Sequence, residues 1–215
     1  MTQETPYNPL DKRNLGASVA EALLIKRAIP LNTLEKFCGA GIYAIYYSGR
    51  FEAYEPIASL NRNDNSVAPI YVGKAVPPGA RKGGVGLEDA PSNALYNRLA
   101  EHAESIDSVH NLRIEDFFCR YLVVDDIWIP LGESLLIATF APVWNTLIDG
   151  FGNHDPGKGR YNGLRPRWDV LHPGRGWAEK CQSRPETAEQ IGIDVVEYLR
   201  THPLLMPSFI HLDGV

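Results

Sequence analysis

The chain has 215 residues, of which 44% are apolar and 22% charged, and its formal net charge is −5. These values predict a folded core and exclude an intrinsically disordered chain. No run approaches the roughly 20 apolar residues of a membrane span, and the polar first residues lack the apolar stretch of a secretory signal. The three cysteines are far apart and form no CxxC pair, which favours neither a zinc site nor a disulfide framework. We therefore expect a reduced, cytoplasmic location.

The first helix and strand are expected before residue 48. Residues 17–27 have a helical pattern rich in good helix formers, and residues 1–14 are expected to form an arm. GIYAIYY, residues 41–47, alternates as a strand does. Its two faces would carry Ile42, Ala44 and Tyr46 on one side and Tyr43, Ile45 and Tyr47 on the other. Tyr43 and Tyr46 therefore cannot share a site.

The remaining elements alternate between strands and helices. Polar residues 48–66 predict a loop insertion, PIYVGKA a second strand, and residues 76–91 a long loop. Ser92 would cap a helix over 93–105, residues 117–124 form a third strand, and Pro130 begins a helix that ends at Ala141-Pro142. Residues 150–176 are irregular, and 186–200 are helical. This order predicts an α+β fold with a small mixed or antiparallel three-stranded sheet flanked by helices.

Positive charge is concentrated in two glycine- and proline-rich segments. Residues 73–86 contain Lys74, Arg81 and Lys82 and no acid, and residues 156–175 contain five cations and one acid. The acidic total argues against a nucleic-acid partner. A protein with two basic segments can nevertheless present a positive face.

Four polar residues are candidates for chemistry. Arg98 and His102 are four apart and share one flank of a helix, although an exposed, incidental pair is the commoner explanation. Glu133 begins an otherwise apolar helix, where it would either complement the helix dipole or bind a metal. Asn145 follows a proline and is typical of a turn. The neighbouring Trp144 is expected to pack rather than to stack on a base.

Taken together, these residues resemble the catalytic core of GIY-YIG nucleases. The resemblance covers residues 39–146 and depends on GIY at 41–43, YVG at 71–73 with Lys74, Arg98-x-x-x-His102, Glu133 and Asn145. YVG replaces YIG, and residues 44–70 separate the two halves by more than the short hairpin of compact members. The insertion and the flanking segments are similar to type II restriction endonucleases of this family, in particular those that cut CCGCGG.

The resemblance implies a Mg²⁺-dependent DNA endonuclease. Tyr43 would be the base that activates water, which requires nearby positive charge from Lys74 or His102 because a free phenol has a pKa of about 10. His102 competes with Tyr43 for this role. Tyr71 would position the water or the phosphate, and Arg98 would hold the scissile phosphate. Glu133 would bind one Mg²⁺, for which Mn²⁺ can substitute, and Asn145 would orient Glu133 or the phosphate.

Recognition of DNA is assigned to the basic segments. Arginine and lysine read guanine in the major groove, which suits a GC-rich palindrome, although each contact could equally be to phosphate. The candidates are Arg81, Lys82, Asn153, His154, Lys158, Arg160, Asn162, Arg165 and Arg167. A palindrome is normally read by a two-fold dimer, so we expect a homodimer on double-stranded DNA and no membrane partner. A bacterial DNA methyltransferase of the same specificity would be its functional counterpart.

Three regions follow from this interpretation. Residues 1–38 would be an N-terminal arm and helix, 39–146 the catalytic core with an insertion at 48–69, and 147–215 a DNA-contacting arm and C-terminal helix. A repair or homing nuclease with the same core, and a DNA-binding module without catalysis, remain alternatives. So do a small-molecule enzyme and a coincidence of tyrosines that only pack.

Overall fold

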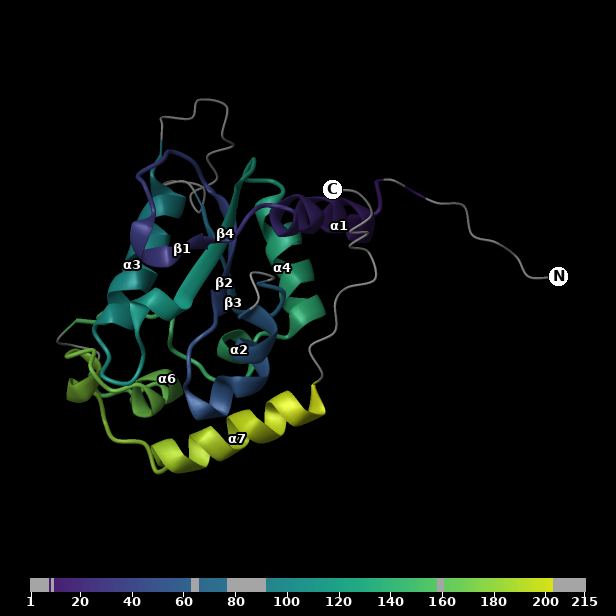
Figure 1. Cartoon of the computed structure of the whole chain (residues 1–215). Helices are drawn as coiled ribbons and strands as arrows, with labels where there is room; N and C mark the ends of the chain where they lie inside the picture. Colours follow the sequence, from purple (N-terminus) through teal and green to yellow (C-terminus); the bar gives the residue numbers. More distant parts are fainter. Residues whose placement is uncertain (1–7, 9, 63–65, 77–91, 158–160, 203–215) are drawn as a thin grey trace.

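The fold is organised by one antiparallel sheet (Figure 1). The computed structural model describes residues 8, 10–62, 66–76, 92–157 and 161–202. The strands lie in the order β1-β4-β2-β3, and each neighbouring pair is antiparallel. Their bounds are β1 Ile29–Pro30, β2 Gly41–Tyr47, β3 Pro69–Ala75 and β4 Phe117–Val123. The prediction of three strands is therefore wrong by one, because β1 is only two residues long and too short for an alternating pattern.

The central strand β2 is buried on both faces, and its alternation divides the core in two. Ile42, Ala44 and Tyr46 belong to one cluster of buried residues, and Tyr43, Ile45 and Tyr47 belong to the other. This confirms the predicted separation of Tyr43 from Tyr46. Any site at the Tyr43 hydroxyl must lie on the second face.

Helices α1 and α4 cover the first face (Figure 1). Helix α1, Lys12–Leu24, begins at Asp11, whose carboxylate accepts the N–H of Arg13 at 2.8 Å. Helix α4, Ile129–Phe140, packs against α1 and the sheet. A side chain at Gly132 would lie within 3 Å of Val19 and Ile42, so this glycine allows the close approach. Because α1 contributes Ala20 and Leu23 to the core, it is an integral part of the fold rather than an arm.

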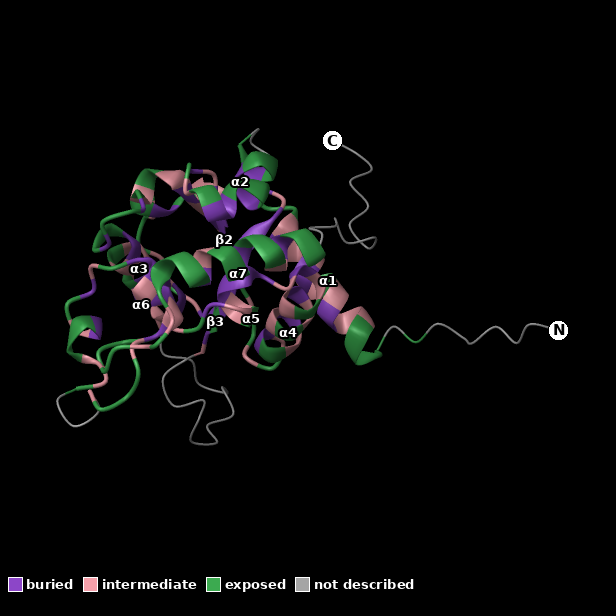
Figure 2. Cartoon of the chain, turned by 90° about the horizontal axis from the view of Figure 1, so that it is seen from below, coloured by how far each residue is buried: buried purple, intermediate pink, exposed green. Residues whose placement is uncertain are grey.

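The other face is covered by α3 and by the part of the chain that follows α4. Helix α3 spans Ala94–Asp107, and short helices α5, Val143–Thr146, and α6, Arg167–Leu171, follow. Helix α7, Ala188–Thr201, begins with a capping box between Thr187 and Gln190 and keeps its outer face exposed (Figure 2). Phe151, Trp168 and Val195 share the Tyr43 core cluster. The segment predicted to be a DNA-contacting arm is thus built into the same core, because its aromatic residues need burial.

The expected loop at 48–66 is helical over residues 52–61. A turn of 3-10 helix η2, Glu52–Tyr54, leads into α2, Glu55–Asn61. Ala53, Tyr54 and Ile57 are buried against the sheet, which the polar composition of the segment obscured. The buried Asn61 side chain closes the insertion by bonding to the backbone of Tyr47 and of Ala68.

The remaining helical turns are short. They are η1 Leu31–Thr33, η4 Ile114–Asp116 and η6 Ala178–Lys180. Among the described helices, none is long and apolar enough to cross a membrane. The three cysteines are free.

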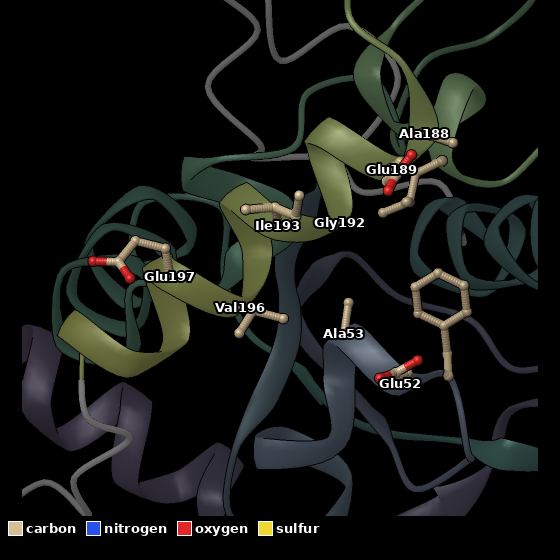
Figure 3. A pocket seen from close by; sticks show the side chains of 10 residues that line it. Glu52, Ala53, Ala188, Glu189, Gly192, Ile193, Val196 and Glu197 are labelled. Carbon is tan, nitrogen blue, oxygen red and sulfur yellow. The ribbon is translucent and has the colours of Figure 1, made fainter.

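A groove of about 520 Å³ runs between α7 and η2 (Figure 3). Ile193 and Val196 of α7 face Ala53 across it, with Glu52 and Glu189 at its rim. No candidate catalytic residue of the described chain lines this groove. The largely apolar hollow is therefore separate from the site built around Tyr43.

Candidate active site

A hydrogen bond between Tyr43 and His102 is the centre of the site. Tyr43 projects from β2, and His102 projects from α3 along the same buried stripe as Leu95 and Leu99. The Tyr43 hydroxyl lies 2.6 Å from His102 Nε2, and both side chains are almost completely buried. Two residues that are far apart in sequence therefore form one buried hydrogen-bonded pair.

Burial sets the charge state of this pair. Loss of solvation raises the pKa of Tyr43 well above its ordinary value, the nearby Tyr71 raises it further, and Arg98 opposes the rise. Burial also lowers the pKa of His102 well below its ordinary value, and the charge of Arg98 lowers it further. Without DNA, Tyr43 is thus a neutral donor and His102 a neutral acceptor. The expected positive charge does not come from His102, and the cation that acts on Tyr43 is Arg98.

Strand β3 places a second phenol beside the first. The Tyr71 ring centroid lies 6.2 Å from that of Tyr43 and 5.2 Å from that of His102. Gly73 pairs with Tyr43 across the sheet, and a Cβ there would lie 2.4 Å from the Tyr43 hydroxyl. The glycine of the YVG motif is therefore required for space, because the Tyr43 phenol lies against its backbone.

Arg98 reaches the pair from α3. Its positive charge lowers the pKa of both Tyr43 and Tyr71, which places the guanidinium beside the two hydroxyls. Nη2 donates to the carbonyl of Gly152 at 2.7 Å, and Nη1 contacts His154 Nε2 at 2.6 Å and Glu101 Oε2 at 3.2 Å. The Arg98 side chain is 21% exposed. A cation held at the surface next to two phenols can bind a phosphate.

Glu133 and Lys74 approach the site together. Lys74 Nζ lies 2.5 Å from Glu133 Oε2, and the Glu133 side chain is 16% exposed. The negative charge of Glu133 raises the pKa of Tyr43 and of Tyr71, so the carboxylate is electrostatically coupled to both phenols. The contacts thus bring Tyr43, Tyr71, Arg98 and His102 together, whereas Glu133 comes from the helix on the other face, pairs with Lys74 and acts on the two phenols through its charge.

Asn145 has a different position from the one predicted. Its Oδ1 accepts the N–H of Val72, and its Nδ2 donates to the carbonyl of Val72, both at 2.8 Å. These bonds hold the edge strand β3, which carries Tyr71. Asn145 therefore supports the backbone that presents a phenol, rather than orienting Glu133. Trp144 packs in the core, as predicted.

The residues predicted to bind DNA separate into three groups. Arg81, Lys82, Lys158 and Arg160 lie outside the described residues. Asn153, His154 and Asn162 are exposed, and the first two line a hollow of about 400 Å³ beside the Arg98 contacts. Of these three, His154 already has a partner within the protein, because it contacts Arg98.

Arg165 and Arg167 form the third group, and the structure corrects the prediction for both. Arg165 donates to the carbonyls of Ala178 and Glu179. Arg167 donates to a backbone carbonyl and pairs with Glu186 and Asp194, with its side chain 13% exposed. Both guanidinium groups hold segments of the protein together, which a count of positive charges cannot reveal.

Two residues at the site were missed by the sequence analysis. Phe151 stacks on His102 with ring centroids 4.4 Å apart and planes 14° from parallel. Gly152 follows, and a Cβ there would lie 2.8 Å from Arg98 Nη2 and 2.9 Å from the Tyr71 hydroxyl. In the sequence, only the aromatic residue and the glycine of the irregular segment GFGNH could have pointed to these two positions.

An antiparallel sheet that presents two tyrosines to an arginine, a histidine and a glutamate on neighbouring helices defines a GIY-YIG nuclease domain. The family model described as the Eco29kI GIY-YIG domain matches residues 35–199. The chain therefore belongs to this family of restriction-type nucleases. The match extends through α6 and most of α7, in agreement with their packing into the catalytic core. A search of curated proteins found no match.

Proposed function

We propose that the protein is a type II restriction endonuclease that hydrolyses double-stranded DNA at a GC-rich palindrome, CCGCGG. The observation that carries the proposal is the buried Tyr43–His102 hydrogen bond beside Arg98 and Glu133. The restriction endonuclease after which the family is named cuts CCGCGG, which supports this target. A homodimer would read the palindrome, and a methyltransferase of the same specificity would protect the host DNA.

A single Mg²⁺ fits the residues present. Mg²⁺ retains several waters and needs only one or two protein carboxylates when a phosphate supplies other oxygens. Glu133 is a partly exposed carboxylate beside the phenols, and its contact with Lys74 is made through Oε2, so Oε1 can serve a metal. Bound there, Mg²⁺ or Mn²⁺ would neutralise charge on the phosphate and its leaving oxygen.

Tyr43 and His102 would move the proton of the attacking water. His102 is neutral and offers the Nε2 lone pair, while Tyr43 keeps its proton in the short bond between them. As water loses a proton to the Tyr43 oxygen, the phenolic proton passes to His102, and the new hydroxide attacks phosphorus. The bond to the 3′ oxygen then breaks, that oxygen takes a proton from a second water, and the proton held by His102 returns to the hydroxide left behind. The two candidate bases thus act in series.

Arg98 and Tyr71 would bind the scissile phosphate. The guanidinium lies beside both hydroxyls, where it would stabilise the negative charge that grows on the phosphate. Lys74 would hold the Glu133 carboxylate in position for the metal. Asn145 would act indirectly, by fixing the strand that carries Tyr71.

The test is plasmid cleavage with Mg²⁺ by the wild type and by Glu133→Gln. We expect discrete fragments from the wild type, cut at CCGCGG, and a loss of at least about 10³-fold for the variant with DNA binding retained. Glu197→Gln, on the exposed side of α7, is the matched control and should cleave normally. A smear of products would contradict site specificity. Intact plasmid in every divalent metal would instead identify a DNA-binding module.

A further inference from the structure

Arg98 is held by a segment that lies more than fifty residues further along the chain. The carbonyl of Gly152 accepts from Nη2 at 2.7 Å, and His154 Nε2 lies 2.6 Å from Nη1. Because guanidinium has only donors, His154 must offer its Nε2 lone pair to this contact. Glu101 adds a longer contact from within α3, at 3.2 Å. The two shortest contacts of the guanidinium thus come from residues 152 and 154.

A buried ion pair fixes this segment. Arg175 donates to the carbonyls of Gly150, Phe151 and Asn153, and its guanidinium pairs with Asp169 at 2.6 Å. Its side chain is 4% exposed, and that of Asp169 is 1% exposed. Two tryptophan rings, those of Trp168 and Trp177, lie over the Arg175 guanidinium. The backbone of residues 150–153 is therefore held by a cation that cannot easily rearrange.

The same segment also contacts the proton-transfer pair. Phe151 stacks on His102 and meets the Tyr71 ring edge-on at 5.0 Å. Gly152 has no side chain at the point where Arg98 Nη2 and the Tyr71 hydroxyl approach it. Residues 150–154 thus touch three of the candidate catalytic side chains at once: Tyr71, Arg98 and His102.

We propose that residues 150–154 form a positioning segment for the active site, in which Gly152 and His154 hold Arg98 in the orientation that receives the phosphate. A free arginine side chain samples many rotamers, and fixing it before DNA arrives removes that cost from the reaction step. This proposal rests on the function proposed above. It makes His154 a positioning residue that acts through Arg98, in contrast to a residue that reads DNA.

Gly152→Ala tests the proposal with one methyl group. The new Cβ would collide with the ends of two side chains, Arg98 and Tyr71, which can move without unfolding the protein. We expect the single-turnover cleavage rate to fall on the order of 10- to 100-fold. Affinity for DNA, measured without divalent metal, should change less than about threefold. Gly192→Ala in α7 adds the same methyl where no atom lies within 4 Å, and it should cleave as the wild type does.

His154 provides the second variant. Its side chain is 61% exposed, so substitution should not affect folding. His154→Ala should slow cleavage at saturating DNA, and His154→Gln, whose amide oxygen can accept from Arg98, should restore most of the rate. His110→Ala, at another exposed histidine, is the control. Equal losses in rate and affinity would overturn the proposal, because they are the result expected of a DNA contact.

A readout independent of cleavage separates this proposal from the proposed function. In ¹⁵N spectra of the DNA-free protein, the Arg98 guanidinium should show slowed exchange in the wild type and fast exchange in Gly152→Ala. If Arg98 is equally mobile in both, or if Gly152→Ala cleaves within threefold of the wild type, residues 150–154 do not position it. A wild-type protein that leaves DNA intact but shows the slowed guanidinium would refute the nuclease proposal and retain the positioning.

Discussion

The described part of the chain contains two buried tyrosine–histidine pairs that differ mainly in their neighbours. The Tyr43 hydroxyl lies 2.6 Å from His102 Nε2, and the Tyr54 hydroxyl lies 2.7 Å from His172 Nε2. All four side chains are almost completely buried. In both pairs, burial raises the pKa of the tyrosine and lowers that of the histidine. A buried tyrosine–histidine hydrogen bond alone therefore does not identify an active site.

The surroundings separate the two pairs. Tyr54 accepts the indole N–H of Trp144 at 2.8 Å, and His172 Nδ1 donates to Asn111 at 2.9 Å, so every polar atom is matched by a neutral partner. Tyr43 instead lies within the fields of Arg98 and Glu133. The protein itself supplies every partner of the Tyr54–His172 pair. The Tyr43–His102 pair lies near charged groups that a phosphate and a metal ion could also bind. What makes the Tyr43 pair a candidate site is the presence of these charged neighbours.

Removing each hydroxyl gives the sharpest test of the contrast. We expect Tyr43→Phe to lower the single-turnover rate of DNA cleavage by about 10²- to 10⁴-fold, because the path for the water proton is lost. Tyr54→Phe should leave the rate of the folded enzyme unchanged. If Tyr54→Phe slows cleavage as strongly as Tyr43→Phe does, the distinction between the two pairs is wrong.

Each of the two substitutions should lower the free energy of unfolding, and by a similar amount. Tyr54→Phe leaves the Trp144 N–H and His172 Nε2 without partners, which should reduce the free energy of unfolding by about 1–3 kcal/mol. Tyr43→Phe leaves His102 Nε2 unpaired and should cost a similar amount. Urea unfolding of the three proteins measures both values. A stable Tyr54→Phe would mean that the core pair contributes nothing that packing does not supply.

The sequence placed Tyr43 and His102 in one candidate site but missed Tyr54 and His172, and there are physical reasons for the difference. Periodicity placed Tyr43 on one face of a strand and His102 on a helix, and both elements exist. Tyr54 lies in the segment read as a polar loop, where many charged and polar side chains hid the buried Ala53 and Ile57. His172 follows α6 in a stretch read as irregular. Local patterns reveal a strand or a helix, but not which distant side chain completes a hydrogen bond.

The arginines illustrate the same limit. Composition marked residues 156–175 as a positive surface, yet Arg165, Arg167 and Arg175 all bind carbonyls or carboxylates of the protein. The sequence shows that each guanidinium is charged, but it does not show which group the guanidinium contacts. The role of Gly152 was equally hidden, because it depends on Arg98, a residue on another element.

Acidification should lower the stability of the folded protein through both pairs. Burial lowers the pKa of His172 from 6.5 to about 3, and that of His102 also lies well below 6.5. Below pH 6.5 the unfolded chain binds protons at both histidines while the folded protein does not, so acid favours unfolding. The stability conferred by the neutral rings is therefore complete above pH 6.5 and is lost as the pH falls toward the folded values.

Each histidine should remove about 1.4 kcal/mol per pH unit across that window. We expect the melting temperature to fall steadily from pH 7 to pH 5, and to fall less steeply in His102→Gln, which has only one of the two titrating rings. ¹⁵N spectra should show both rings still neutral at pH 5 in the wild type. A melting temperature that does not change over this range would mean that the folded protein takes up protons at these sites as readily as the unfolded chain. Both pairs would then be more open to water than their burial implies, and the proposed transfer from Tyr43 to a neutral His102 would lose its basis.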